Sequence, residues 1–167
     1  MGQAYRMLGF VVIAILYVVI GIMAARGTIG IFRKMFTPKV EQIFYAMFLM
    51  LVAGFYLAFA AYFDAASAWR LETTAVVVFV ALGLVGMRLP MALIVGYPLH
   101  GLWDALHEIP AHGGPSAFGP GQMTAIPLAY GFFCAAFDFY MAIYFYQRRV
   151  EWNAARDAGR SARTVRS

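Results

Sequence analysis

The sequence predicts an all-α protein, a polytopic bundle of five transmembrane helices. Hydrophobic residues make up 63% of its 167 residues and charged residues 13%. A soluble domain carries about 45–50% apolar and about 25% charged residues. The apolar residues gather in runs that approach or exceed the ~20 residues needed to cross a bilayer core. The basic residues lie in alternate connections between these runs, which is the usual pattern of membrane orientation.

The first two apolar runs have clear helix signals. Residues 7–25 carry no charge. This run is longer than a signal-peptide core, so we expect it to be a retained helix. Residues 40–63 follow Thr37 and Pro38. Threonine suits an N-cap and proline suits the first turn, where its missing N–H costs nothing.

The remaining runs are shorter or contain polar residues. Residues 73–87 are followed by Arg88 and Pro90, which together indicate a turn before the run 91–107. A single helix through both runs would measure roughly 52 Å, well beyond a hydrocarbon core of about 30 Å. We therefore expect two helices there. Residues 124–146 form the fifth span.

The positions of the basic residues predict the orientation. Four of them lie in residues 26–39, one is Arg88, and six lie in residues 148–166. The positive-inside rule then places the N-terminus outside and the C-terminus in the cytoplasm. We expect residues 1–147 to be a single transmembrane bundle and residues 148–167 a basic cytoplasmic tail. The expected location is the cell membrane, with lipids as partners and no nucleic acid.

The fourth run carries three ionisable residues on one helical face. Relative to His100, the i+4 residue Asp104 lies about 40° to one side and the i+7 residue His107 about 20° to the other. Trp103 borders this stripe, and Pro98 removes a backbone hydrogen bond just before it. Ionisable groups inside a membrane are costly, and they are functional candidates for that reason.

Two imidazoles and a carboxylate suit a transition metal such as Zn, Cu or Fe as cofactor. On a straight helix, however, His100 and His107 lie about 10 Å apart, too far for one metal. Three arrangements stay open: Asp104 pairs with one histidine at a time, two sites exist, or the kink shortens the distance. Neighbouring helices would supply the remaining ligands.

The fifth run supplies the next candidate, Asp138. It and His100 both lie roughly 13 Å from the cytoplasmic end on consecutive antiparallel helices, so we expect them to meet. Glu72, at the start of the third run, is a candidate for an additional ligand. The residues expected around the site are Trp103, Cys134 and Tyr56.

Each candidate also has a structural interpretation. A carboxylate such as Glu72 is favoured near a helix N-terminus, and Cys134 suits a small core position. His107 lies near the interface, where polar residues cost little. Glu41 and His112 are expected to be solvated. Hydrogen bonds between His and Asp can also serve only to hold helices together.

Two segments resemble a known family. Residues 100–107 read His-Gly-Leu-Trp-Asp-Ala-Leu-His, and residues 133–138 read Phe-Cys-Ala-Ala-Phe-Asp. They resemble an uncharacterised bacterial family of small multi-pass membrane proteins, with a His-Gly-x-Trp-Asp-x-x-His helix and a later Phe-Cys-x-x-x-Asp helix. Tyr56 to Phe59 and Glu72 are similar to further positions of this family, so the resemblance covers roughly residues 40–146. It implies the fold and a bacterial inner membrane, and no activity.

Two functions follow from these residues. In the first, His100, Asp104, His107 and Asp138, with Glu72, bind a transition metal or relay protons, as in a membrane metalloenzyme acting on a lipid-soluble substrate. In the second, a non-enzymatic membrane subunit or carrier uses its His–Asp pairs only to lock helix packing. Either form is compatible with a membrane protein partner or a homo-oligomer. Whether the protein is an enzyme is left undecided.

Overall fold

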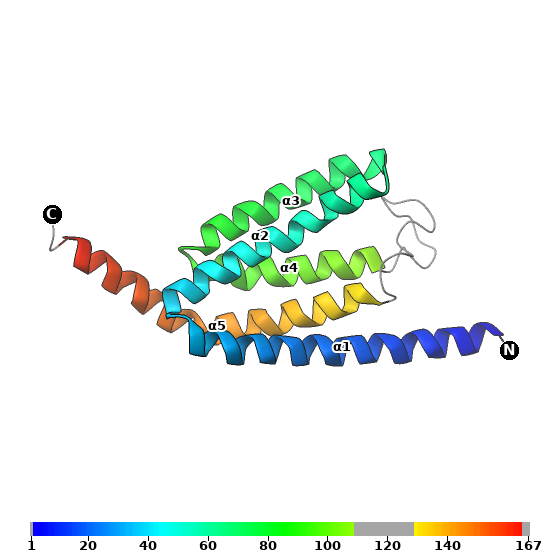
Figure 1. The fold of residues 1–167 in the computed structure, drawn as a ribbon, viewed down its shortest axis with the longest axis horizontal. Coiled ribbons are helices and arrows are strands. Elements are labelled where there is room, and N and C mark those ends of the chain that lie inside the picture. The colour runs from blue at the N-terminus through cyan, green and yellow to red at the C-terminus, as the bar shows by residue number, and fades with distance from the viewer. Residues whose placement is uncertain (1, 109–128, 165–167) are drawn as a thin grey trace.

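The computed structural model describes residues 2–108 and 129–164, and every regular element in these ranges is an α-helix (Figure 1). The prediction of an all-α fold is therefore confirmed. In chain order the helices are α1 (Gly2–Met35), α2 (Pro38–Tyr62), α3 (Ala66–Gly86), α4 (Pro90–Glu108) and α5 (Tyr130–Thr164). The expected break between the third and fourth runs is present, because α3 ends at Gly86 and α4 begins at Pro90.

Three of the described helices are long and apolar enough to cross a membrane: Met7–Met35 within α1, the whole of α2 and the whole of α3. The fourth and fifth helices differ in composition. Helix α4 contains the polar stripe, and α5 continues for 35 residues into its Arg-rich end.

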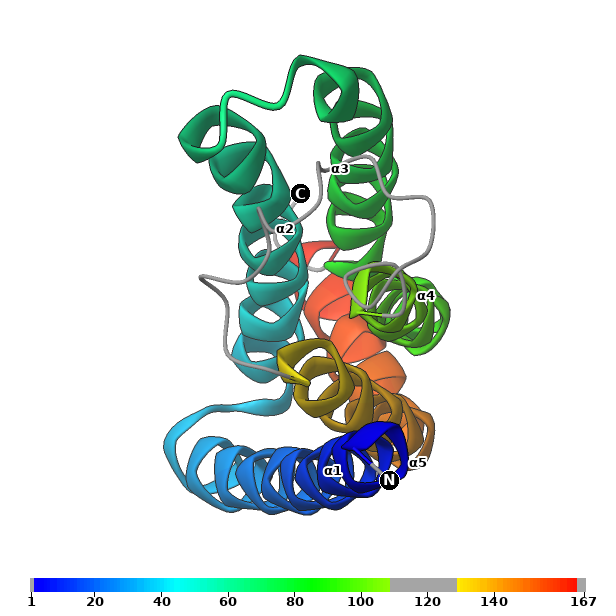
Figure 2. The same cartoon turned by 90° about the vertical axis from the view of Figure 1, so that its right-hand side faces the viewer.

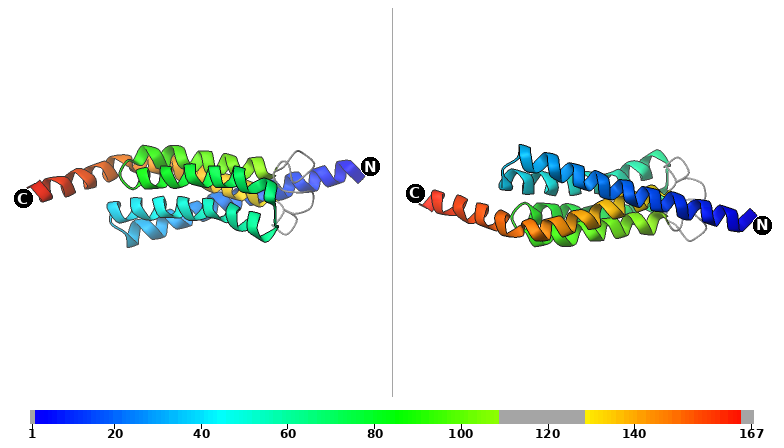
Figure 3. Two further views of the ribbon diagram at one scale, coloured as in Figure 1. Left: turned by 90° about the horizontal axis from the view of Figure 1, so that it is seen from above. Right: turned by 90° about the horizontal axis from the view of Figure 1, so that it is seen from below.

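The helices lie roughly along a common axis. Viewed from the end, α5 sits between α1 and α4, and α2 and α3 pair with each other on the other side (Figure 2). The two termini lie at opposite ends, and both α1 and α5 extend beyond the rest of the bundle (Figure 3). The α1–α2 and α3–α4 connections lie at the end from which α5 projects (Figure 1). The basic connections therefore share one end, which we call the basic end.

The two ends of α2 differ in how far they follow local sequence signals. Pro38 occupies the first turn of α2 as expected, but the side chain of the N-cap residue Thr37 makes no capping hydrogen bond. At the other end of α2, Asp64 has a φ of 48°. The N–H of Ala65 bonds the carbonyl of Ala60 at 3.0 Å, and that of Asp64 bonds Ala61 at 3.3 Å. This pair of bonds is a Schellman motif, with Asp64 in the place usually taken by glycine.

The end of α3 is capped from outside the helix. The carbonyl of Gly86 accepts a 2.7 Å hydrogen bond from the side-chain amide of Gln42, and that of Met87 accepts one from Lys39. The carbonyl of Arg88 accepts one from Arg156 at 3.2 Å. Helices leave their last carbonyls without internal partners. Here side chains of α2 and α5 donate the missing hydrogen bonds, and they thereby fix the tight α3–α4 turn.

The apolar core fills the bundle from the basic end towards its middle. Its largest fully buried members are Trp152, Tyr45, Tyr97, Phe145, Leu49, Leu93 and Met141. The rings of Tyr45 and Phe145 lie 5.0 Å apart, and those of Phe145 and Trp152 5.3 Å apart. Trp152 belongs to the segment 148–167 expected to be a tail, yet it is buried in a continuous α5. The polar groups described next lie in the other half of the bundle.

Candidate functional site

Helix α4 carries the candidate residues into the bundle interior. His100, Asp104 and Asp138 are 4%, 5% and 4% exposed. Gly101 brings α4 close to α5, because a Cβ atom there would lie 3.0 Å from the Cα atom of Ala135 and 3.1 Å from the Cβ atom of Asp138. The absence of a side chain at residue 101 thus permits the approach that places Asp138 beside His100.

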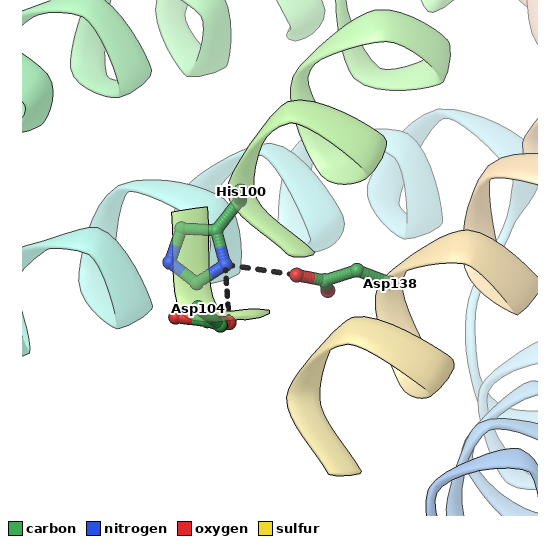
Figure 4. A group of neighbouring side chains, drawn as sticks. All are labelled: His100, Asp104 and Asp138. Carbon is green, nitrogen blue, oxygen red and sulfur yellow. Dashed lines mark hydrogen bonds and ion pairs between the residues drawn. The ribbon is translucent and has the colours of Figure 1, made fainter. Parts of the chain in front are cut away.

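His100 is flanked by two carboxylates. Its Nδ1 atom is hydrogen-bonded to the Oδ2 atom of Asp138 at 2.8 Å and lies 3.2 Å from the Oδ2 atom of Asp104 (Figure 4). The contact expected from the matched depth of His100 and Asp138 is therefore confirmed. We refer to His100, Asp104 and Asp138 as the cluster; ligand atoms of the three residues all lie within 4.8 Å of one another.

Two atoms of the cluster are buried without a hydrogen-bond partner among the described residues, the Oδ2 atom of Asp104 and the Nε2 atom of His100. The other oxygen of Asp104, Oδ1, accepts a 2.5 Å hydrogen bond from the hydroxyl of Tyr56. The ring of Phe79 packs edge-on against the imidazole, with centroids 5.1 Å apart. Buried polar atoms normally have partners, so the two unpartnered atoms need an explanation.

His107 does not join this cluster. Its Nε2 atom is hydrogen-bonded to Oε1 of Glu72 at 2.9 Å, and its Nδ1 atom lies 2.8 Å from the carbonyl oxygen of Trp103. The indole N–H of Trp103 donates to Oε2 of Glu72 at 3.2 Å. Glu72 is fully buried, and the structure joins it to His107 and Trp103 rather than to His100. We call Glu72 and His107 the outer pair.

The sequence left open how the polar stripe of α4 is arranged. In the structure Asp104 pairs with His100, and His107 pairs with Glu72 of α3. The stripe therefore divides into two groups. Tyr56 links them: its hydroxyl binds Asp104, and its ring lies 4.5 Å from that of His107. Cys134 is half-buried on α5, one turn before Asp138. His112 lies outside the described residues.

A second buried polar group lies at the basic end, and the sequence analysis missed it. Glu41 was expected to be solvated, but it is fully buried. Its carboxylate accepts hydrogen bonds from Arg148 at 2.9 Å, from Trp152 at 3.2 Å and from the hydroxyl of Tyr144. The expectation failed because it treated residues near the end of an apolar run as exposed, whereas α5 continues and covers Glu41. The available signal was the presence of Arg148 and Trp152 directly after the apolar run 124–146.

Comparison with known proteins adds no relative. No family model matches the chain, and no curated protein or solved structure matches it either. The chemistry of the site therefore rests on its own geometry, and the resemblance noted from the sequence stays a prediction.

The cluster lacks one positive charge. With both carboxylates ionised and the imidazole protonated, its net charge is −1, in a place where uncompensated charge is costly. A proton on one carboxylate or a bound cation restores the balance. A metal bonded at about 2.1 Å holds neighbouring ligand atoms roughly 3 Å apart. The 2.8 and 3.2 Å separations around Nδ1 are close to that spacing.

Proposed function

We propose that the chain is a multi-pass integral membrane protein of a bacterial inner membrane, with five spans and a cytoplasmic C-terminus. Three helices support this by length and composition. Helix α4 supports it by the sorting of its side chains, because polar residues face inward while apolar ones form an exposed stripe. The exposed residues of that stripe are Met91, Val95, Leu99, Leu102 and Leu106. A helix with polar residues inside and apolar residues outside has the reverse of the distribution found in soluble proteins, and this suits a helix surrounded by lipid.

Helix α5 has the same distribution over its apolar part. Asp138 is buried, while Phe139 and Ile143 are 48% and 60% exposed. Arg33, Lys34 and Arg88 are exposed at the basic end, which supports its assignment to the cytoplasmic side. The bacterial location rests on the resemblance of residues 100–107 and 133–138 to the small membrane-protein family.

The proposed activity of the cluster is binding of a divalent transition metal such as Zn, Cu or Fe. One observation carries it: buried carboxylate oxygens of Asp138 and Asp104 converge on the same nitrogen atom of His100, at 2.8 and 3.2 Å. An imidazole and two carboxylates are a ligand set of this metal class, and three protein ligands leave positions open. A divalent metal on Nδ1 would displace the imidazole proton, and its two positive charges would balance the two carboxylates. In an enzyme such a metal would activate water or oxygen towards a lipid-soluble substrate.

The competing function is a structural one, and the outer pair provides its example. Both ring nitrogens of His107 have partners, and Glu72 accepts bonds from two side chains. This group holds α3 to α4 and leaves no ligand atom of His107 unused. If the cluster acted in the same way, the protein would be a helix-locked subunit or carrier without a metal.

The deciding experiment is metal analysis of the protein purified in mild detergent, by mass spectrometry and after reconstitution with Zn, Cu, Fe and Mn. We expect close to one metal per chain, lost in His100→Ala and Asp104→Ala. His107→Gln is the matched control, because this histidine lies on the same helix outside the cluster, and it should keep the metal. Absence of metal after reconstitution would contradict the proposal and favour the helix lock.

A further inference from the structure

We propose that Tyr56 is the positioning residue of the metal site, and that the outer pair holds Tyr56 in place. This inference rests on the proposed metal binding by the cluster. It assigns a role to the α2–α3 hairpin, which supplies none of the three cluster residues but contacts the cluster through Tyr56 and through the ring of Phe79.

The first step is the choice between the two oxygens of Asp104. The hydroxyl of Tyr56 donates to Oδ1 at 2.5 Å, a distance typical of a charge-assisted O–H···O⁻ bond. That bond leaves Oδ2 facing Nδ1 of His100 at 3.2 Å. A carboxylate on a short side chain can rotate about its last bond. Tyr56 therefore decides which oxygen is presented to the metal and in which plane.

The second step is the rigidity of Tyr56 itself. Its side chain comes from α2, is 8% exposed, and lies with its ring 4.5 Å from the ring of His107. His107 cannot turn freely, because the carbonyl of Trp103 and the carboxylate of Glu72 hold its two nitrogens at 2.8 and 2.9 Å. The outer pair thus supports the aromatic face on which Tyr56 rests.

The third step is the energetic consequence. Groups that hydrogen-bond a metal ligand orient it, and removing one typically lowers metal affinity about 10–100-fold. In Tyr56→Phe the ring and its packing stay, and only the bond to Asp104 is lost. The variant should therefore keep the fold and a stoichiometry near one metal per chain while the metal is held more weakly.

Tyr62 provides a matched control. It lies at the end of the same helix, is 78% exposed, and its ring packs against that of Phe63 rather than against the cluster. The test is a titration of detergent-purified protein with Co²⁺, whose visible absorption reports the ligand geometry directly. We expect Tyr56→Phe to raise the Kd for Co²⁺ about 10–100-fold and to shift the absorption bands. Tyr62→Phe should match the wild-type protein in both.

The outcomes separate the two proposals. Co²⁺ binding by the wild-type protein with the same Kd and spectrum in Tyr56→Phe would overturn the role of Tyr56 and leave the metal site standing. No Co²⁺ binding by the wild-type protein would overturn the metal site itself and the inference with it. If Tyr56→Phe fails to fold, Glu72→Gln serves instead: a shifted Co²⁺ spectrum supports the inference and an unchanged one overturns it.

Discussion

The Nε atom of Arg148 lies 2.9 Å from a carboxylate oxygen of Glu41, and both side chains are buried, at 6% and 0% exposure. Glu41 comes from the first turn of α2, and Arg148 follows the apolar part of α5. The pair ties these two helices together at the basic end. It also fixes the start of the α5 extension against the bundle.

Removing Glu41 should destabilise the protein strongly. In Glu41→Ala the Arg148 charge loses its buried partner and keeps only the exposed Glu151, and the hydroxyl of Tyr144 and the N–H of Trp152 lose their acceptor. Breaking a buried ion pair from one side costs about 3–5 kcal/mol. Thermal unfolding in detergent measures the loss. Glu151→Gln is the control, because Glu151 is the exposed partner of the same arginine and its removal should cost about 0–1 kcal/mol. Equal losses for both variants would contradict the prediction.

Gly21 marks the place where α1 crosses α5. A Cβ atom there would overlap the carbonyl oxygen of Phe133 and lie 3.2 Å from the Cβ atom of Ala136. Gly21→Ala should therefore push the helices apart at a cost of about 1–3 kcal/mol in unfolding free energy. Gly9→Ala, on the same helix with nothing within 4 Å, should leave stability unchanged or slightly raised. Chemical unfolding of the two variants side by side tests this, and an unaffected Gly21→Ala protein would refute the close crossing.

The variant Glu72→Gln tests whether Glu72 holds helices together or ligates the metal. Glu72→Gln weakens the bonds to His107 and Trp103, and hydrogen bonds to charged groups contribute about 1.5–3 kcal/mol each. We expect lower thermal stability with the metal content of the wild-type protein. Asp64→Asn is the control, because Asp64 is exposed near the same end and asparagine tolerates its positive φ. Loss of the metal in Glu72→Gln, with the metal retained in Tyr56→Phe, would show instead that Glu72 is a ligand.

The five-span topology makes a prediction at the end of α4. If α4 crosses the membrane, Glu108 faces the same side as Asp64; if only the first three helices cross, it faces the side of Arg88. Because the chain has a single cysteine, Cys134→Ser provides a cysteine-free background for labelling. We expect Glu108→Cys and Asp64→Cys to react with an impermeant thiol reagent from outside intact cells, and Arg88→Cys to be protected. Protection of Glu108→Cys together with Arg88→Cys would rule out the fourth span.

Hydropathy predicted where the helices lie better than where they end. The run 7–25 lies inside α1, which continues to Met35. The described part of the run 124–146 enters α5 at Tyr130, and this helix continues to Thr164. An apolar run records where side chains meet a non-aqueous environment, whereas a helix continues for as long as its backbone bonds are made. Arg33 and Arg149 are helical for this reason, although they are charged.

Contacts along α4 and between helices at equal depth could also be predicted. The spacing of His100 and Asp104 and the depth of Asp138 led to the cluster. The partner of His107 could not be derived in this way. That partner depends on how α3 is rotated against α4, and a sequence pattern does not specify the rotation of a helix that is apolar on most sides. The burial of Glu41 was missed for a different reason: α5 continues beyond the apolar run 124–146, and its residues Arg148 and Trp152 cover Glu41.

The three residues of the cluster are not synthesised together. His100 and Asp104 lie on α4, while Asp138 lies on α5, which comes last of the described helices in chain order. If α4 spans the membrane as proposed, His100 and Asp104 lack their partner Asp138 in lipid until α5 docks, which is unfavourable. The same late helix provides the surface on which α1 packs. A chain that lacks α5 is therefore without Asp138 of the cluster and also without the surface on which α1 packs.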